Sequence, residues 1–341
     1  MPKKMKAAVF EGEGKLELKD MPVPKVEKPD DVLLKVEAAS VCGTDVHILH
    51  VPPGHPATPG SVLGHEYVGE VIALGEDASC ALSVGDKVAV DPNITCGSCS
   101  HCRSGRHNMC HEMSTLGIFT HGGFAPFNVA PARQCYPYDA EMKPEIAVFA
   151  EPLACVANAV RRIAFYPGES CVVLGGGPIG QYFAGFARAA GCDPVIISEP
   201  VAFRRKFAKK SGATHVIDPS KQNVEDMVFA ETGAGADVVV DAVGALFPSA
   251  IRLAARGGRI MLFGQNQQAR VEVLQNEITR GELTVMGSYI ARHTFPDALR
   301  ALETGVVKVE HLITHLIGLD EIFDGIEAMK SGKAMKVIVK Y

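Results

Sequence analysis

The sequence predicts an α/β plus β protein of two domains, in which a mostly antiparallel β domain precedes a doubly wound parallel sheet. Three observations lead to this prediction. The chain has 341 residues, enough for two domains of moderate size. Up to about residue 90, short β-like runs alternate with glycine and proline turns, which is typical of irregular antiparallel sheets. From about residue 153, apolar strands alternate with helical segments, which indicates a parallel sheet with helices on both faces.

The β-like runs of the first part are KAAVF, VLLKVEAAS, YVGEVIALG and DKVAV. The second part begins with SCVVLGGGPIGQYFAGFARAAG, which predicts a strand, a glycine turn and a helix, and DPVIISEPVAFRRKFAKKSGA repeats strand and helix. THVID, ADVVVDAVG and GGRIMLFG supply further buried strands, and the final AMKVIVKY predicts a strand that returns to the first domain. We therefore expect domains at residues 1–152 and 153–289, with residues 290–341 completing the first.

Composition and charge exclude some classes of function. A content of 47% hydrophobic and 21% charged residues is typical of a soluble globular protein. The net charge of -5 gives no electrostatic basis for binding nucleic acid or acidic membranes. MPKKMKAAVF lacks the apolar core of a signal peptide, and no stretch approaches the ~20 apolar residues of a membrane span. We expect a cytoplasmic protein whose partners are small molecules.

Cysteine and histidine are concentrated in the first third of the chain. Five of the ten cysteines lie between residues 80 and 110, and eight of the twelve histidines lie between residues 47 and 121. Disulfides are rare in the cytosol, so we expect metal binding in this part of the chain. The scattered cysteines are expected to be small buried hydrophobic side chains: Cys135, Cys155, Cys171 and Cys192.

The segment CGSCSHCRSGRHNMC spaces four cysteines so that they can surround one tetrahedral zinc ion. These are Cys96, Cys99, Cys102 and Cys110. Because four sulfurs leave no position for a substrate, we expect this cysteine lobe, residues 91–111, to hold a structural zinc. An iron–sulfur cluster is the alternative, but a second such run and the following proline are missing. The neighbouring histidines are expected to be polar loop residues: His101, His107 and His111.

A second set of metal-binding side chains lies in SVCGTDVHILH, LGHEYVGEV and FAEPLACVANAV. A catalytic zinc needs three protein ligands and one open position. Cys42 and His65 suit two of these positions, and a carboxylate from Glu66 or Glu151 suits the third. Asp45 would accept the other ring N–H of His65 and fix its tautomer.

The adjacent His65 and Glu66 raise a geometric question, because neighbouring side chains in a strand point to opposite faces. The preceding HPATPGSVLG predicts a loop, with the strand starting only near Tyr67, so both could turn toward one ion. Singly, each residue has a simpler interpretation, such as packing for Cys42 and a helix start for Glu151. Together, beside the cysteine lobe, the residues favour a metal site.

VVLGGGPIG fits the dinucleotide pattern through Gly175, Gly177 and Gly180, directly after an apolar strand and before an amphipathic helix. The glycines permit a tight turn and a close approach to pyrophosphate at a helix N-terminus. Glu199 ends the next strand, where an acid would accept hydrogen bonds from ribose hydroxyls and repel a 2′-phosphate. NAD is therefore favoured over NADP, although Arg204 and Arg205 could fold back onto a phosphate. A flavodoxin-like or methyltransferase turn is the alternative.

With these motifs in order, the chain resembles the zinc-dependent medium-chain dehydrogenase family of alcohol, polyol and threonine dehydrogenases. The resemblance runs nearly end to end, through CGTDVH, GHEYVGEV, VGDKVAV, the cysteine lobe, GGFAPF, AEPLACVANAV and GGGPIG. It implies a GroES-like catalytic domain, an inserted Rossmann domain, and a substrate in the cleft between them. The two metal sites described above predict two zinc ions per chain.

The resemblance also implies roles for individual residues. Thr44 would hold the substrate hydroxyl and begin a proton relay that ends at His47. In the polyol branch, Glu66 would bind the zinc and Glu151 the zinc-bound water, and the two could exchange. Around the cofactor, the positions that match the family are Pro178, Ile179, Glu199 and Arg204.

Substrate identity depends on GSYIARH. Sorbitol dehydrogenase-like members carry an Arg–Tyr pair where this chain has Ile290 and Ala291, and the arginine of the threonine dehydrogenase pattern is also missing. We favour a secondary alcohol of a polyol, cyclitol or sugar, with a threonine, amino-alcohol or simple alcohol substrate as alternatives. Tyr289, Arg292 and His293 are candidates to line the pocket.

Two other classes of function are weighed against this one. A zinc-independent enone or quinone reductase is disfavoured by Cys42, His65 and Glu66, and a non-catalytic binding protein by the intact metal and cofactor motifs. The resemblance implies a homodimer or homotetramer, with edge strands around residues 270–290 of the Rossmann domain pairing across the dimer.

Overall fold

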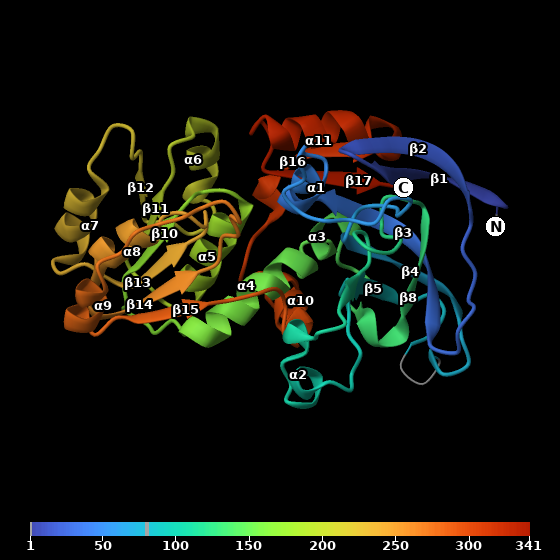
Figure 1. Ribbon diagram of the computed structural model, residues 1–341, viewed down its shortest axis with the longest axis horizontal. Helices are drawn as coiled ribbons and strands as arrows, with labels where there is room; N and C mark the ends of the chain where they lie inside the picture. Colours follow the sequence, from blue (N-terminus) through green and yellow to red (C-terminus); the bar gives the residue numbers. More distant parts are fainter. Residues whose placement is uncertain (1, 79–81) are drawn as a thin grey trace. The chain divides into compact units, whose positions relative to one another are not determined.

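The computed structural model describes residues 2–78 and 82–341, so Cys80 lies outside the described residues. The chain divides into two compact units (Figure 1). Unit 1 comprises Met1–Pro152, Phe295–Glu303 and Ile313–Tyr341, and unit 2 comprises Leu153–Thr294 and Thr304–Leu312. The C-terminal segment expected to complete the first domain is thus divided, because residues 290–294 and 304–312 belong to unit 2.

Unit 1 is built on a mostly antiparallel sheet with the strand order β16-β17-β3-β4-β5-β9, to which β8 adds by pairing with β3. The strands of this sheet are β3 (Asp31–Val41), β4 (Glu66–Leu74), β5 (Lys87–Val90), β8 (Phe127–Pro131), β9 (Cys135–Pro137), β16 (Ile313–Gly318) and β17 (Lys336–Lys340). Two smaller sheets join β1 (Lys4–Gly12) to β2 (Lys15–Pro22) and β6 (Asn93–Ile94) to β7 (Ser114–Thr115).

The C-terminal strand β17 pairs antiparallel with β3, with Ile338 opposite Ser40. The last residues of the chain therefore lie beside a strand from its beginning, as AMKVIVKY predicts. Short helices complete the unit: α1 (Gly43–Ile48), α2 (Ser100–Arg103), α3 (Pro144–Ala147), α10 (Phe295–Glu303), α11 (Ile322–Lys330), and the 3-10 turns η2 (His107–Met109), η3 (Ala132–Gln134) and η5 (Leu319–Glu321).

Unit 2 holds a six-stranded, fully parallel sheet with the order β12-β11-β10-β13-β14-β15. Its strands are β10 (Cys171–Leu174), β11 (Val195–Ser198), β12 (His215–Ile217), β13 (Ala236–Asp241), β14 (Ala254–Leu262) and β15 (Thr284–Gly287). Its helices are α4 (Ala150–Ile163, which begins in unit 1), α5 (Pro178–Ala189), α6 (Ala202–Ala208), α7 (Val224–Thr232), α8 (Phe247–Leu253), α9 (Gln275–Gly281) and the 3-10 turn η4 (Glu310–Leu312).

The order of this sheet reverses between β10 and β13, because the chain runs outward through β11 and β12 and then resumes on the other side of β10. Ligands bind at such a switch point, outside the carboxyl ends of the strands. The two sheets confirm the predicted fold class. The scattered cysteines are buried as predicted: Cys135, Cys155, Cys171 and Cys192.

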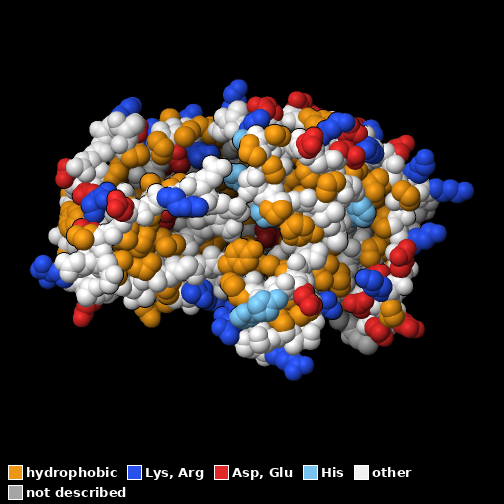
Figure 2. All heavy atoms as spheres, viewed as in Figure 1, with side chains coloured by type: hydrophobic (Ala, Val, Ile, Leu, Met, Phe, Trp, Pro, Cys, Tyr) orange, Lys and Arg blue, Asp and Glu red, His pale blue; other side chains and the backbone are white. Residues whose placement is uncertain are grey.

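On the face shown in Figure 2, acidic and basic side chains are interspersed, and neither sign forms a broad field. This agrees with the small net charge of -5. Among the residues that the structure describes, no helix is both long enough and apolar enough to cross a membrane.

Candidate metal and dinucleotide sites

The structure brings Cys42, His65 and Glu66 together, and their ligand atoms all lie within 4.8 Å of one another. We refer to them as the Cys42 group. Cys42 follows β3 and is the N-cap of α1. Glu66 is the first residue of β4, one residue earlier than expected, while His65 still belongs to the preceding loop. Because only one of the two adjacent residues is in the strand, both can face the same point.

Gly64 produces the turn that makes this possible. Its φ of +90° lies in the left-handed region, which favours glycine. A Cβ at this position would also lie 2.6 Å from the ring of Phe124. The glycine beside the two ligands is therefore required both by the backbone conformation and by the packing.

His65 and Glu66 are buried, whereas Cys42 is half-buried. His65 is 5% exposed and Glu66 is 1% exposed. Burial and the nearby Glu66 carboxylate raise the pKa of the Cys42 thiol. Burial alone would raise the pKa of the Glu66 carboxyl, but Lys336, His65 and Ser40 outweigh this effect and lower it. A divalent cation would reverse the effect on Cys42, since a metal-bound thiol is deprotonated outright.

Asp45 supports this group from α1. Its side chain is fully buried, and one carboxylate oxygen accepts a 2.8 Å hydrogen bond from the backbone N–H of Cys42. The other oxygen lies 3.6 Å from Nδ1 of His65, and neither atom has a hydrogen-bond partner among the described residues. Two buried polar atoms that face each other in this way fit a histidine whose other ring nitrogen binds a metal.

Two contacts to Glu66 were not foreseen from the sequence. Ser40, which is opposite Glu66 in the β3–β4 register, donates its hydroxyl to Oε2 of Glu66. The ammonium of Lys336 on β17 donates to the same oxygen and lies over the ring of Phe149. A lysine within the apolar run AMKVIVKY is a signal that could have indicated a buried ion pair.

The remaining residues proposed for this region lie on α1 and α4. The hydroxyl oxygen of Thr44 lies 3.7 Å from the sulfur of Cys42. His47 is exposed at the end of α1, and partial desolvation together with His50 and His55 lowers its pKa. Glu151 is buried in the first turn of α4, but it is not part of the Cys42 group.

The four cysteines of the cysteine lobe also meet, with their sulfurs within 4.8 Å of one another. Backbone N–H groups of Cys99 and Ser98 lower the pKa of Cys96 to about 6. Burial and the neighbouring thiols raise the pKa of Cys102 to about 11. Four converging sulfurs, some already stabilised as thiolates by backbone N–H groups, fit a closed tetrahedral zinc shell. The histidines of the lobe stand outside this group, and the rings of His101 and His111 pack at 4.8 Å.

The glycine turn in unit 2 joins β10 to α5. Gly175 has a φ of +99°, and a Cβ on Gly180 would lie 1.9 Å from the carbonyl oxygen of Gly175. These two glycines therefore make the turn and allow the helix to pack on the strand. Nothing lies within 4 Å of a Cβ placed on Gly177, the N-cap of α5, so the backbone there is open to a ligand. Pro178 and Ile179 follow as the first two residues of the helix.

Glu199 lies at the end of β11 and is 2% exposed. Its two carboxylate oxygens accept hydrogen bonds of 2.7 Å from the backbone N–H groups of Gly176 and Val201. A guanidinium nitrogen of Arg204 lies 3.9 Å from Glu199, whereas Arg205 binds the carbonyl of Glu199 and pairs with Asp218 at 2.8 Å. The guanidinium of Arg205 is therefore already bound to other residues of unit 2.

The residues considered for the substrate pocket, Tyr289, Arg292 and His293, lie in the loop that follows β15. Tyr289 is 39% exposed. The structure therefore places all three in unit 2, after the carboxyl end of an edge strand.

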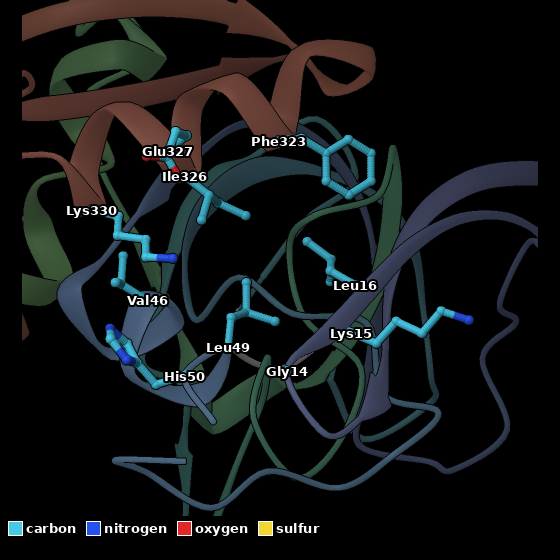
Figure 3. A pocket seen from close by; sticks show the side chains of 10 residues that line it. All are labelled: Gly14, Lys15, Leu16, Val46, Leu49, His50, Phe323, Ile326, Glu327 and Lys330. Atoms are coloured by element: carbon cyan, nitrogen blue, oxygen red, sulfur yellow. The ribbon is translucent and has the colours of Figure 1, made fainter. Parts of the chain in front are cut away.

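A pocket of about 340 Å³ opens elsewhere in unit 1, between the β1–β2 turn, the end of α1 and helix α11 (Figure 3). Leu16, Val46 and Ile326 contribute apolar lining, and Lys330 and Glu327 contribute charges. None of the candidate metal ligands lines it, so this pocket is separate from the Cys42 group.

Comparison with known proteins shows the family to which the chain belongs. Residues 28–140 match the family described as the alcohol dehydrogenase GroES-like domain, and residues 178–304 match the zinc-binding dehydrogenase family. An L-threonine 3-dehydrogenase of Pyrococcus horikoshii is 35% identical over 94% of each chain. The chain belongs to the zinc-dependent medium-chain alcohol dehydrogenase family. A sorbitol dehydrogenase of Bacillus subtilis is 30% identical over 99% of this chain and 98% of its own.

Solved structures of this family superpose over the whole chain. A zinc-binding dehydrogenase of Sinorhizobium meliloti 1021 bound to NADP is 34% identical, with a TM-score of 0.93 and 100% of both chains covered. A protein of Escherichia coli CFT073 described as a short chain alcohol dehydrogenase, in complex with NADH, is 30% identical, with a TM-score of 0.91 and the same coverage. The predicted family and enzyme class are confirmed: the protein is a zinc-dependent oxidoreductase that acts on the CH–OH group of a small molecule.

Proposed function

We propose that this dehydrogenase uses NAD to oxidise a secondary alcohol of a polyol, cyclitol or sugar-like molecule, or to reduce the corresponding ketone. The observation that carries the proposal is the Cys42 group, in which three side chains of the types that zinc prefers converge and no fourth ligand joins them among the described residues. A shell of this kind leaves one position for a substrate oxygen.

Cys42, His65 and Glu66 would hold the catalytic zinc, and Asp45 would orient His65. Glu151 is the alternative third ligand, and its burial in the first turn of α4 is consistent with an exchange between the two carboxylates. When bound, the zinc is a Lewis acid that stabilises the deprotonated form of the alcohol. Cys96, Cys99, Cys102 and Cys110 would hold the second, structural zinc.

Thr44 and His47 are proposed to move the proton of the substrate alcohol. The Thr44 hydroxyl lies beside the sulfur of Cys42, where it can bind a hydroxyl held next to the ligand. His47 is exposed, so it can exchange protons with water, and its lowered pKa keeps the ring neutral and able to accept a proton near pH 7.

The open turn at Gly177 and the carboxylate of Glu199 support NAD as the cofactor. Gly175, Pro178, Ile179 and Gly180 would shape the turn around the pyrophosphate. Each oxygen of Glu199 has one backbone donor, which leaves a lone pair for a ribose hydroxyl. Arg205 pairs with Asp218 and is therefore not available to a 2′-phosphate, which leaves Arg204 to meet one beside the repelling carboxylate of Glu199. We therefore propose that NADP is the weaker cofactor.

The choice of substrate rests on the loop after β15. A threonine substrate carries a carboxylate, and the arginine that follows a glycine in the threonine dehydrogenase pattern is missing from GSYIARH. Ile290 and Ala291, which stand where sorbitol dehydrogenase-like members carry an Arg–Tyr pair, offer no charge to a substrate either, and Ala291 is only 2% exposed. The similarity to L-threonine 3-dehydrogenases keeps an amino-alcohol as the second candidate.

We further propose a homodimer or homotetramer in the cytoplasm. The edge position of β15 and the exposed apolar side chains Val271, Val273 and Leu274 support pairing of unit 2 with a second copy. Five of the nine described cysteines belong to the two candidate metal groups, which supports a reducing compartment.

The test is a screen of NAD⁺ and NADP⁺ reduction against polyols, cyclitols, amino alcohols including L-threonine, and simple alcohols. We expect the highest kcat/KM with NAD⁺ and a polyhydroxylated secondary alcohol. A higher value with L-threonine would replace this substrate with the second candidate. Full activity in protein verified to be metal-free would overturn the zinc mechanism.

A further inference from the structure

The loop that follows β15 is held in an unusual backbone conformation. Ile290 has a φ of +38° and His293 has a φ of +51°, both in the left-handed region. A β-branched residue is a clear outlier there, because its Cβ crowds the adjacent carbonyl oxygen. Such strain persists only where the surroundings hold it in place, and it is concentrated at functional sites.

The restraint comes from Asn158 on α4. Its side-chain amide donates to the carbonyl oxygens of both Tyr289, at 3.3 Å, and Ile290, at 2.7 Å. Asn158 is 3% exposed, so these bonds replace water that cannot reach the amide. One buried side chain therefore fixes the direction of two consecutive peptide groups at the strained residue.

The same face of α4 holds the rest of the loop. Thr294, which is fully buried, donates its hydroxyl to the carbonyl of Ala154 at 2.6 Å and accepts from the backbone N–H of Arg292 at 3.2 Å. Arg161 donates to the carbonyl of His293 at 3.4 Å. Residues 154, 158 and 161 are spaced four and three apart, which places them on one side of a helix.

The position of the loop in the sheet indicates what the restraint is for. In this sheet the glycine turn and Glu199 follow β10 and β11, which assigns that half to the adenosine of a dinucleotide. The carboxyl ends of β13, β14 and β15 form the other half, where the nicotinamide would lie. The loop of residues 288–294 begins at the carboxyl end of β15.

We propose that Asn158 is a positioning residue that holds Tyr289 and Ile290 in the strained conformation needed to receive the nicotinamide half of the cofactor. This inference rests on the proposed use of NAD. Asn158 acts through the loop and does not touch the cofactor. Without it, Ile290 relaxes to a negative φ, and the peptide groups on either side of it turn away.

The test compares two ligands that share the adenosine half. In Asn158→Ala, we expect the dissociation constant of NADH for the zinc-containing enzyme to rise about tenfold, while that of ADP-ribose, which lacks nicotinamide, stays within about twofold of the wild type. Asn223→Ala is the matched control. Asn223 also binds two main-chain groups in unit 2, accepting from the N–H groups of Glu225 and Asp226, so its loss should lower stability without changing either constant.

Ile290→Gly separates positioning from general damage, because glycine adopts a positive φ without strain. In an Ile290→Gly background, Asn158→Ala should weaken NADH binding by no more than about threefold. Equal weakening of NADH and ADP-ribose, or unchanged NADH binding in Asn158→Ala, would overturn the proposal. A wild-type enzyme that binds neither ligand would instead refute the proposed cofactor, and with it the role of the loop.

Discussion

In the cysteine lobe, four sulfurs come from fifteen consecutive residues, whereas the Cys42 group takes its ligands from the end of β3 and the beginning of β4, two neighbouring strands of the main sheet. In the lobe, backbone N–H groups of the same segment lower the pKa of Cys96 and of Cys99. The Cys42 group depends on side chains from distant parts of the chain, since Glu66 is held by Ser40 and by Lys336 on the C-terminal strand.

Under the proposed function, this difference explains how one unit would hold both a catalytic and a structural zinc. A local, saturated shell binds a metal that supports its own segment and nothing else. A shell assembled at the ends of core strands has a fixed geometry and room for a further ligand, and its buried carboxylate is paired with a buried ammonium. The substitutions below test this contrast, beginning with the largest expected effect.

Cys42→Ser should lower kcat/KM by about a thousandfold or more, because loss of the metal removes several kcal/mol of transition-state stabilisation. The fold should remain intact, since Cys42 is a small side chain at the start of α1. Steady-state kinetics and circular dichroism on the same sample check both statements. An active or an unfolded variant would remove the distinction between the two sites.

Lys336→Met should lower the free energy of unfolding by about 3–5 kcal/mol, because it leaves the buried Glu66 carboxylate without its ammonium partner. Lys340→Met is the control on the same strand. Lys340 pairs with Glu145 and is 44% exposed, so its loss should cost no more than about 1 kcal/mol. Urea unfolding measures both values. Similar effects of the two substitutions would show that Glu66 does not depend on the buried lysine.

Cys96→Ser should lower stability by no more than about 3 kcal/mol and the Tm by no more than roughly 6–12 °C, since only the lobe would lose its metal. Turnover per folded molecule should stay within about twofold of the wild type, because this shell offers no position to a substrate. Calorimetry and kinetics at a temperature well below the transition provide the check. A loss of turnover without a loss of stability would contradict a structural role.

The smallest effect concerns Asp91, the first residue of the cysteine lobe. Burial raises the pKa of its carboxyl to about 6, although hydrogen bonds from Asn93 act in the opposite direction. A carboxyl with a raised folded-state pKa contributes stability that is fully present below its unfolded-state pKa and is lost as the pH rises through about 6. Asp91→Asn should therefore be more stable than the wild type by about 2 kcal/mol at pH 8 and by much less at pH 4. Urea unfolding at the two pH values decides it, and an equal difference at both would be contrary to this expectation.

The cysteine lobe and the glycine turn could be predicted from the sequence because each is a local pattern whose spacing alone determines its geometry. The Cys42 group was predicted less completely. Its ligands were named, but Lys336 and Ser40 reach Glu66 only through the pairing of β17 and β4 with β3, and strand register cannot be read from a single sequence. The strained loop at Ile290 was missed for a similar reason, since its conformation depends on Asn158, 132 residues earlier.

The central claim is that one zinc serves catalysis and the other serves the fold. The most direct test is the zinc-to-protein ratio of Cys42→Ser and Cys96→Ser, determined by elemental analysis alongside turnover. We expect about two zinc ions in the wild type and about one in each variant, with turnover retained only in Cys96→Ser. A Cys42→Ser protein that keeps both zinc ions and its activity, or a single substitution that empties both sites, would contradict the account.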